Sequence, residues 1–424
     1  MRFWDTLKQI FTLPDLRRRV LYAIILLLIA RVLAHLPLPG VDLVELQNFF
    51  SRNQMFGLLN MFSGGAMENF SIIMMGVGPY ITSSIIMQLL TMVIPALEEL
   101  QKEGESGQQK INYWTRMLTV PLALIQSYAM LTILRNQQIV PSWTMLELAV
   151  MLISITAGTI LLMWIGELIS ENGIGNGVSL IITLGIVAGI PTQVRNTLAV
   201  LDTTKIIGLI IFGIIALAVV VLIVIVNEGR RQIPVSYARR IRGLKAYGGV
   251  DTHLPIRVNT AGVIPIIFAM SIMLFPGIAA KFLTQARSEW LASGATWVAN
   301  LFANNLFYGL MYFLFVVFFT FFYTGIILKP TQIAENLQKQ GGFVPGVRPG
   351  RETADFLGRV ISRINLTGAI FLGVIAVLPF IVQAITKINT LVIGGTGVLI
   401  MVSVIIETMR QIQAQLVMRQ YENY

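Results

Sequence analysis

Apolar residues in this chain come in long uninterrupted runs that are separated by short polar segments. Each run holds roughly twenty residues, the length that an α-helix needs to cross a hydrocarbon core about 30 Å thick. The runs lack the strict alternation of a membrane β-strand, which argues against a β-barrel. The pattern predicts an all-α integral membrane protein with ten transmembrane helices, at about residues 20–38, 72–94, 116–134, 148–168, 177–194, 206–226, 261–283, 306–328, 366–385 and 391–409.

Basic residues are distributed unevenly among the polar segments. The N-terminus, the even-numbered segments and the C-terminus hold 23 of the 31 Lys and Arg, with Arg116 at the edge of the third run included. Cytoplasmic segments carry the excess of Lys and Arg in membrane proteins, so we expect both termini in the cytoplasm.

Two of these cytoplasmic segments are especially basic. Segments 228–257 and 329–363 carry seven and six Lys or Arg, more than orientation requires. Scattered positive charge on such loops commonly reflects solvation and membrane topology alone. A docking surface for RNA phosphates or for an acidic protein surface is the sharper interpretation.

The composition agrees with a membrane protein. The chain has 424 residues, of which 55% are hydrophobic and only 12% charged, and a soluble protein of this size could not bury that much apolar surface. A net charge of +10 favours contact with anionic lipid headgroups or with acidic partners. The chain has no cysteine, which excludes disulfides and thiolate chemistry.

The sequence offers no catalytic site, metal site or cofactor motif. Between the ends of the ten runs, Arg31 is the only clear ionisable residue, whereas ion-coupled transporters usually need charge near the midplane. The chain contains no phosphate-binding loop, and its two histidines, His35 and His253, lack metal-ligand spacing. These absences favour a passive conduit that is driven from outside. A secondary transporter for a small solute and a membrane enzyme or insertase-like scaffold without a through-pore are the alternatives.

The order of the runs indicates one membrane domain with two halves. We expect an amphipathic cytoplasmic N-terminus at 1–19, a first half at 20–199, a second half at 200–409 and a cytoplasmic tail at 410–424. The second half would carry the cytoplasmic loops at about 228–258 and 329–365. Five helices per half would place the halves in opposite orientation, as an inverted repeat around a central hourglass pore, although no sequence repeat is visible.

Two local patterns fit a pore. The Gly-rich, half-apolar segment Asn60–Ser71 is too short to span the membrane and could fold back into a cavity, an ordinary external loop being the alternative. The β-branched pairs Val77/Ile81 and Val178/Ile182 have the i, i+4 spacing that places two side chains on one helix face. Such stiff side chains from several helices could form a narrow hydrophobic ring, or they could simply face lipid or other helices.

Short motifs in a fixed order carry a family resemblance along the whole chain. They are NMFSGGA at 60–66, GPYI at 78–81, SIIMQLL at 84–90, EGESG at 103–107, GIGNG at 173–177, THLP at 252–255, AGVIP at 261–265, GFVPGVRPG at 342–350 and QYE at 420–422. With these motifs the chain resembles the SecY family, whose members are the central subunit of the bacterial protein-conducting channel.

The resemblance implies four groups of site residues. The plug that blocks the resting pore would include Asn60, Met61, Phe62, Ser63, Gly64, Gly65, Ala66 and Met67 within about 60–71. The pore ring would be formed by Val77, Ile81, Val178, Ile182, Ile267 and Ile400. The lateral gate that releases segments into lipid would include Ile85, Ile86, Gln88, Leu89, Ile264 and Met270. Partner docking would fall to Arg230, Arg231, Arg239, Arg240, Arg348 and Arg351.

The resemblance also implies an activity and a set of partners. We expect the pore-forming subunit of a preprotein translocase in the bacterial inner membrane, without catalysis or cofactors of its own. It would pass unfolded polypeptides across the membrane and release transmembrane segments sideways into lipid. The implied partners are SecE-like and SecG-like small membrane subunits, the SecA motor ATPase, the ribosome, signal sequences, nascent chains and anionic lipids.

Overall fold

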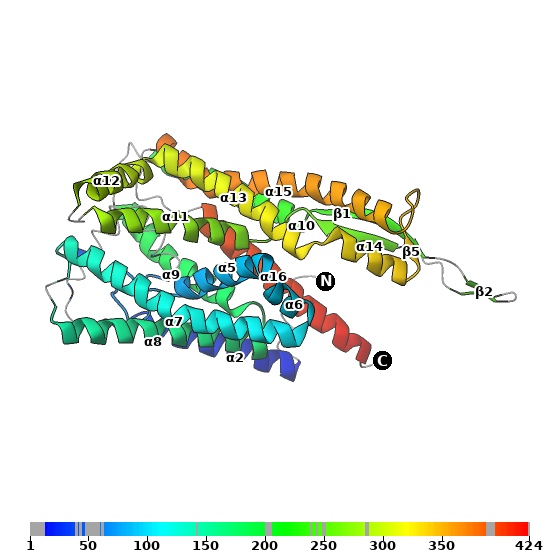
Figure 1. The fold of residues 1–424 in the computed structure, drawn as a ribbon, viewed down its shortest axis with the longest axis horizontal. Coiled ribbons are helices and arrows are strands. Elements are labelled where there is room, and N and C mark those ends of the chain that lie inside the picture. Colours follow the sequence, from blue (N-terminus) through cyan, green and yellow to red (C-terminus); the bar gives the residue numbers. More distant parts are fainter. Residues whose placement is uncertain are drawn as a thin grey trace. The chain divides into compact units, whose positions relative to one another are not determined.

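A computed structural model defines the fold of the chain, which divides into two compact units (Figure 1). The first unit comprises residues 1–206, 271–304 and 387–424, and the second comprises residues 207–270 and 305–386. The residues that the structure describes are 13–38, 41, 45–46, 60, 63–140, 143–199, 206–237, 240–242, 245–247, 252–284, 288–386 and 395–422.

In its described residues the first unit consists of helices joined by turns, with one isolated β-bridge between Pro37 and Ser71. Its helices are α2 (Pro14–Leu33), α5 (Gly78–Val93), α6 (Pro95–Lys102), α7 (Glu105–Asn136), α8 (Met145–Asn172), α9 (Gly177–Ala199), α12 (Glu289–Ala303) and α16 (Gly395–Glu422). Helix α11 (Ile264–Leu283) begins in the second unit and ends in the first. Apolar runs of this length form helices because a lipid environment leaves the backbone no other way to satisfy its hydrogen bonds within one segment.

Two helix boundaries show how local sequence limits the apolar runs. The run predicted at 72–94 is helical only from Gly78, because residues 72–77 form turns that include Gly76 at φ 57°. At its other end, α5 bends by 101° into α6 at Pro95, whose ring clashes with the preceding turn of a continuing helix. Helix α8 begins with a capping box in which Thr144 and Glu147 satisfy each other's backbone N–H groups.

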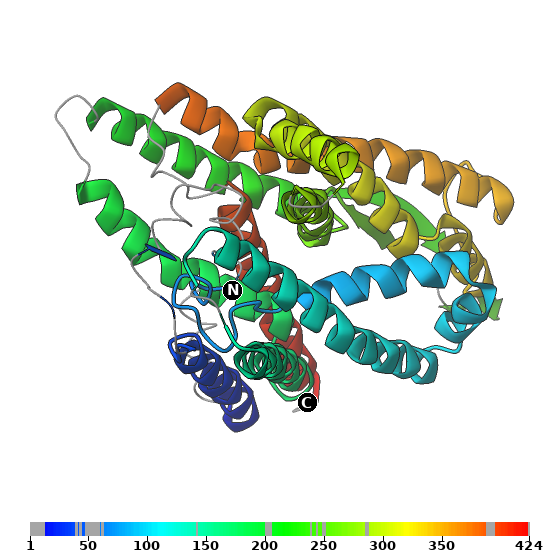
Figure 2. The ribbon, with the colours of Figure 1, turned by 60° about the vertical axis from the view of Figure 1, so that its left-hand side comes forward.

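Glycines let the helices of the first unit approach one another closely. Helix α7 packs between α5 and α8, and Figures 1 and 2 show α7 alongside each of these two helices. Where α9 meets α8, a Cβ atom on Gly177 would lie only 1.9 Å from the backbone oxygen of Gly166. Small residues at helix contacts are typical of membrane bundles, because packing rather than hydrophobicity drives association in lipid.

The second unit combines helices with two small sheets. It contains most of α10 (Ile206–Glu228), the strands β1 (Arg230–Tyr237), β2 (Arg240–Arg242), β3 (Lys245–Tyr247) and β4 (Thr252–Arg257), helices α13 (Asn305–Ile327) and α14 (Pro330–Lys339), strand β5 (Gly342–Phe343) and helix α15 (Arg351–Thr386). Helix α13 packs along α15, and Thr324 donates a buried hydrogen bond of 2.9 Å to Asn365 Oδ1 across this contact. Strands β2 and β3 pair with each other, and β1 lies between β4 and β5.

The predicted class is confirmed, because each of the ten apolar runs contains a helix or most of one. Among the described residues, five helices are long and apolar enough to cross a membrane, or six when the bent pair α5 and α6 is taken as one span. Shorter apolar helices occupy 177–192, 213–228 and 264–273, and the structure is consistent with a total of ten spans. The division into two five-helix halves stays a prediction.

The close approach of α8 and α9 yields a stability prediction. Replacing Gly177 by Ala should force the backbone apart and destabilise the fold by about 1–3 kcal/mol. The change should lower the thermal unfolding temperature in detergent. Gly213→Ala is the matched control, since its Cβ would meet open space on α10 and should leave that temperature unchanged or slightly raised. Equal behaviour of the two variants would contradict the packing described for α8 and α9.

Candidate functional site

The Gly-rich segment before α5 is buried in the first unit. Ala66 and Phe70 are fully inaccessible to solvent, and Met67 is 2% exposed. Met67 and Phe70 join a core cluster with Met74, and with Leu131 and Leu134 of α7. The segment therefore packs against helices rather than projecting as an exposed external loop.

Internal hydrogen bonds hold this irregular backbone together. The Gly65 N–H donates to the Asn60 carbonyl at 2.9 Å, and the Glu68 N–H donates to Asn60 Oδ1 at 3.1 Å. Gly64 and Gly65 have φ values of 73° and 79°, which disfavour residues with a side chain. Met61 and Phe62, which the sequence analysis also assigned to the plug, lie outside the described residues.

The same segment is tied to α2 and to the residues that follow it. Arg31 Nη1 donates a hydrogen bond of 2.7 Å to the Gly64 carbonyl. Farther along, the Leu38 N–H donates to the Phe70 carbonyl at 2.8 Å, and the Ile72 N–H donates to the Leu36 carbonyl at 3.1 Å. The segment is thus anchored to α2 at one end and to the residues that follow α2 at the other.

Glu68 is the titratable group of this segment. Burial raises the pKa of the Glu68 carboxyl above its ordinary value, and a hydrogen bond with the Asn60 side chain partly offsets the rise. A raised pKa means that the packed state binds the proton more strongly than an exposed glutamate does. The packed arrangement therefore loses stability as the pH rises from the ordinary glutamate pKa through the raised value.

The predicted ring residues fall on four helices. Val77 caps the start of α5 and is 3% exposed, Ile182 on α9 is 1% exposed, and Ile400 on α16 is inaccessible. Ile81 on α5 and Val178 on α9 are partly buried. Ile267, on the part of α11 that belongs to the second unit, is 9% exposed. Five of the six residues lie in the first unit, and their convergence on one ring stays a prediction.

The predicted gate residues lie on two helices. Ile85, Ile86, Gln88 and Leu89 lie on α5, where Gln88 Nε2 donates to Ser84 Oγ at 3.3 Å, one helical turn away. Ile264 and Met270 lie on α11, in the second unit. The pairing of the two groups as a gate stays a prediction.

The two basic segments, predicted as loops, are folded together in the second unit. Strand β1 pairs with β4 inside the first segment and with β5 of the second, with Ser236 opposite Phe343. Beneath this sheet lies a cluster of buried residues from both segments, namely Ile233, Ile256, Val344, Leu357 and Ile361. We call this arrangement of β1, β4, β5, α14 and the start of α15 the basic platform.

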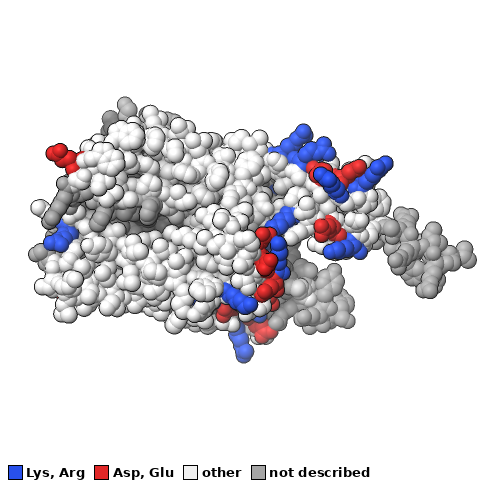
Figure 3. All heavy atoms as spheres, viewed as in Figure 1, with Lys and Arg blue, Asp and Glu red and all other residues white. Residues whose placement is uncertain are grey.

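The platform exposes most of the predicted docking residues. Arg230 and Arg231 open β1, and Arg348 and Arg351 flank the start of α15, all with exposed side chains. Arg239 lies outside the described residues, and Arg240 begins β2 without a described side chain. Most of the charged side chains visible in Figure 3 lie toward one end of the helices, a few lie at the opposite end, and the surface between them is largely uncharged in this view.

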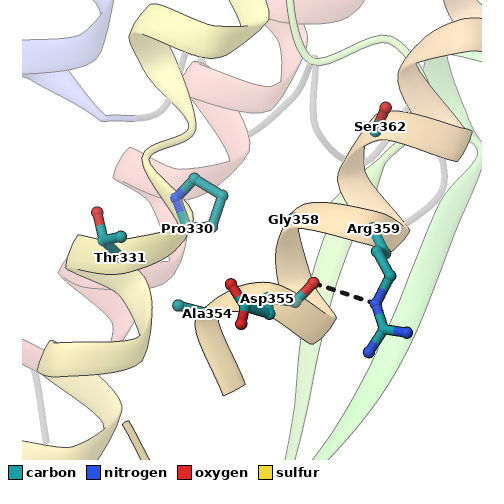
Figure 4. Close-up of a pocket in the computed structure, with 7 residues that line it drawn as sticks. All are labelled: Pro330, Thr331, Ala354, Asp355, Gly358, Arg359 and Ser362. Atoms are coloured by element: carbon teal, nitrogen blue, oxygen red, sulfur yellow. Dashed lines mark hydrogen bonds between the residues drawn. The ribbon is translucent and has the colours of Figure 1, made fainter. Parts of the chain in front are cut away.

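A groove of about 560 Å³ separates α14 from α15 on the platform. Figure 4 shows Pro330 and Thr331 on one side of it and Asp355 on the other, with the Arg359 guanidinium directed away from Pro330. Arg359 Nε donates to the Asp355 carbonyl at 3.4 Å within α15. Among the described residues, no three His, Asp or Glu side chains gather as a metal site would require.

An ion pair that the sequence did not predict joins α7 and α8. Arg116 on α7 and Glu167 on α8 approach to 2.7 Å, with side chains that are 40% and 19% exposed. The 2.7 Å distance joins Arg116 Nε to Glu167 Oε1, so the two opposite charges attract each other directly. Arg31 is thus not the only ionisable residue in the runs, because Glu167, Lys281 and Glu407 also lie within a few residues of their ends. These residues lie near the ends of the apolar runs, where the boundary between a run and a polar segment is hard to place from sequence.

These observations define the class of protein. Apolar helices long enough to cross a membrane, a buried irregular segment before one of them and a basic folded platform are the features of a helical integral membrane protein. The model of the SecY family matches residues 71–409. The chain belongs to the SecY family.

Curated relatives match the chain over nearly its full length. The protein translocase subunit SecY of Streptomyces coelicolor is 41% identical and aligns with 98% of both chains. The protein of the same description from Mycobacterium tuberculosis strain H37Rv is also 41% identical, over 97% of both chains.

Solved structures share the fold at lower sequence identity. A protein-conducting channel has a TM-score of 0.65 at 18% identity and covers 94% of this chain and 92% of its own. Sec61 in a canine ribosome–channel complex has a TM-score of 0.62 at 19% identity, with the same coverage.

The ion pair between α7 and α8 yields a second prediction. Removing either charge, by Arg116→Met or Glu167→Gln, should lower the thermal stability of the protein in lipid nanodiscs. The double variant should lose less than the sum of the two, with a coupling energy of about 0.5–1 kcal/mol for a half-exposed pair. Strictly additive losses would show that the two side chains do not interact.

Proposed function

We propose that the chain is the pore-forming subunit of a preprotein translocase and passes unfolded polypeptides across the bacterial inner membrane. The observation that carries the proposal is the full-length match to translocase subunits together with a buried, Gly-rich segment directly before α5. A conduit for arbitrary sequences needs no catalytic group, and the function requires a seal, a constriction and a place for a motor.

The buried segment 63–71 supplies the seal in this proposal. It is half-apolar, packed against α7, and attached to its surroundings mainly through hydrogen bonds to backbone groups. Such an insert can be displaced as a unit, because the packing contacts and hydrogen bonds that hold its described residues are reversible. We therefore assign it the role of a plug in the resting channel.

The β-branched residues of α5, α9, α11 and α16 supply the constriction. Isoleucine and valine have few side-chain rotamers, so a ring of them would keep a defined narrow opening. A hydrophobic constriction excludes ions by dewetting, yet an extended polypeptide can part it. Segments of high hydrophobicity would instead leave sideways between α5 and α11, because transfer into lipid is favourable for them.

The basic platform supplies the docking surface. Its sheet joins the two cytoplasmic segments into one body, so a partner bound to exposed arginines on either segment pulls on both. Acidic protein surfaces and RNA phosphates are the chemistries that such arginines attract. We infer that SecA and the ribosome bind here, that SecE-like and SecG-like subunits complete the channel, and that both termini are cytoplasmic.

Reconstitution tests the proposed function directly. The chain in proteoliposomes with SecE-like and SecG-like subunits, SecA and ATP should import a preprotein into a protease-protected space. A preprotein that stays fully sensitive to protease, with all components folded, would contradict the proposal.

The docking role of Arg348 yields a third prediction. Arg348→Glu should reduce SecA-dependent import several-fold in the same assay, because it reverses a charge on the exposed face of the platform. Arg195→Glu, an identical charge change on the exposed end of α9, is the matched control and should import normally. Normal import by the Arg348 variant would remove this residue from the docking surface.

The plug role yields a fourth prediction. Deleting residues 61–70 should raise the resting ion conductance of the channel in planar bilayers several-fold, since the seal is removed. An unchanged conductance in a deletion variant that still imports preprotein would show that the segment does not block the pore.

A further inference from the structure

We propose that Arg31 is a positioning residue that latches the plug segment in its closed place through the plug backbone. The inference rests on the plug role proposed above and names the group that holds the segment. The acceptor of the Arg31 hydrogen bond is a main-chain carbonyl, so the latch does not depend on the side chains of the plug segment.

The geometry of the hydrogen bond carries the first step. Arg31 lies in the last turn of α2, and its Nη1 atom donates to the Gly64 carbonyl at 2.7 Å, across 33 residues of sequence. A guanidinium in an apolar run is costly unless it is paired or reaches water. Hydrogen bonds that involve a charged group are roughly twice as strong as neutral ones, so this bond favours the closed position.

The shape of the plug at Gly64 carries the second step. Gly64 adopts φ 73°, and a Cβ atom there would lie 3.0 Å from the Cα of Gly185 on α9. The turn that presents the Gly64 carbonyl to Arg31 thus also presses the segment against α9. The carbonyl reaches the guanidinium only when the segment is fully seated, so the bond reports and stabilises that one position.

A small cavity beside the bond carries the third step. It has a volume of about 20 Å³, and Arg31, Gly64, Val77 and Gly185 are among the residues that line it. A space of this size holds about one water molecule. Once the segment leaves, the guanidinium can donate its hydrogen bond to water in place of the Gly64 carbonyl, so the latch is reversible.

The latch is distinct from the apolar packing of the same segment. Apolar packing depends on the buried side chains of Met67 and Phe70. The hydrogen bond of Arg31 depends instead on the main-chain carbonyl of Gly64 and involves no plug side chain. The latch predicts that Arg31 variants loosen the plug even when its sequence is intact. It also predicts that they have no effect when the plug is absent.

The experiment compares resting conductance in planar bilayers for channels assembled with the small subunits. Arg31→Met should raise it about tenfold, the ratio that one hydrogen bond to a charged group supports, and Arg31→Lys should give a smaller rise. Arg135→Met is the matched control, because Arg135 lies in the last turn of α7 with its guanidinium 5.0 Å from the centre of the Trp143 ring. The control should conduct like the unaltered chain.

Plug deletion separates the latch from the proposed function. In a channel that lacks residues 61–70, Arg31→Met should add nothing to the leak. A leak on deletion without any effect of Arg31→Met would overturn the latch alone. A further rise in the deleted background would place the action of Arg31 elsewhere, and the absence of a leak on deletion would overturn the plug role and the latch together.

A second measurement follows the segment itself and keeps the test independent of conductance. The chain has no cysteine, so Ser63→Cys introduces a single thiol beside Gly64. Its rate of maleimide labelling should increase about tenfold in the Arg31→Met background and stay unchanged in the Arg135→Met background. Equal labelling rates in all three channels, each with normal helix content, would overturn the proposal.

Discussion

The absence of water in the hydrocarbon core is the constraint on which this structure depends. Every backbone N–H and carbonyl at that depth needs a partner inside the protein. The stretch 63–77 is not helical, and it meets the requirement through its own turns and through bonds to the chain after α2, such as Leu38 N–H to the Phe70 carbonyl. Its burial against α7 is therefore a condition of its existence, and a segment that must be buried to be stable is well suited to fill a passage.

The same constraint decides where the chain can place sheet and charge. An open-edged sheet exposes unpaired backbone groups, which only water can satisfy. The three strands β4, β1 and β5 accordingly occur in the two most basic segments, with exposed arginines around them and an apolar cluster beneath. The ion pair of Arg116 and Glu167 likewise lies toward the end of α8, where a half-exposed pair costs little to maintain.

Hydropathy predicts the helices of this protein because a run of about twenty apolar residues has one stable form in lipid. It does not predict where a helix begins when turns precede it, as at Gly78, since residues 72–77 are as apolar as the helix. The pairing of β1 with β5 is also hidden, because the two strands are far apart in sequence and β5 has only two residues. The motifs of the SecY family predicted the plug segment, whereas the hydrogen bond from Arg31 to the Gly64 carbonyl became visible only in three dimensions, because main-chain carbonyls are the same at every position of a sequence.

A plug has to satisfy two opposing requirements, a tight seal at rest and ready release. Apolar packing of Phe70 and Met67 favours the closed state but does not depend strongly on one exact position. A directional bond between Arg31 and the Gly64 carbonyl does depend on position, and it is lost at once when the segment shifts. In the proposed latch, apolar packing provides most of the stability of the closed plug, and the Arg31 guanidinium fixes its exact position. A small displacement of α2 relative to the plug therefore breaks the hydrogen bond and leaves packing alone to hold the plug closed.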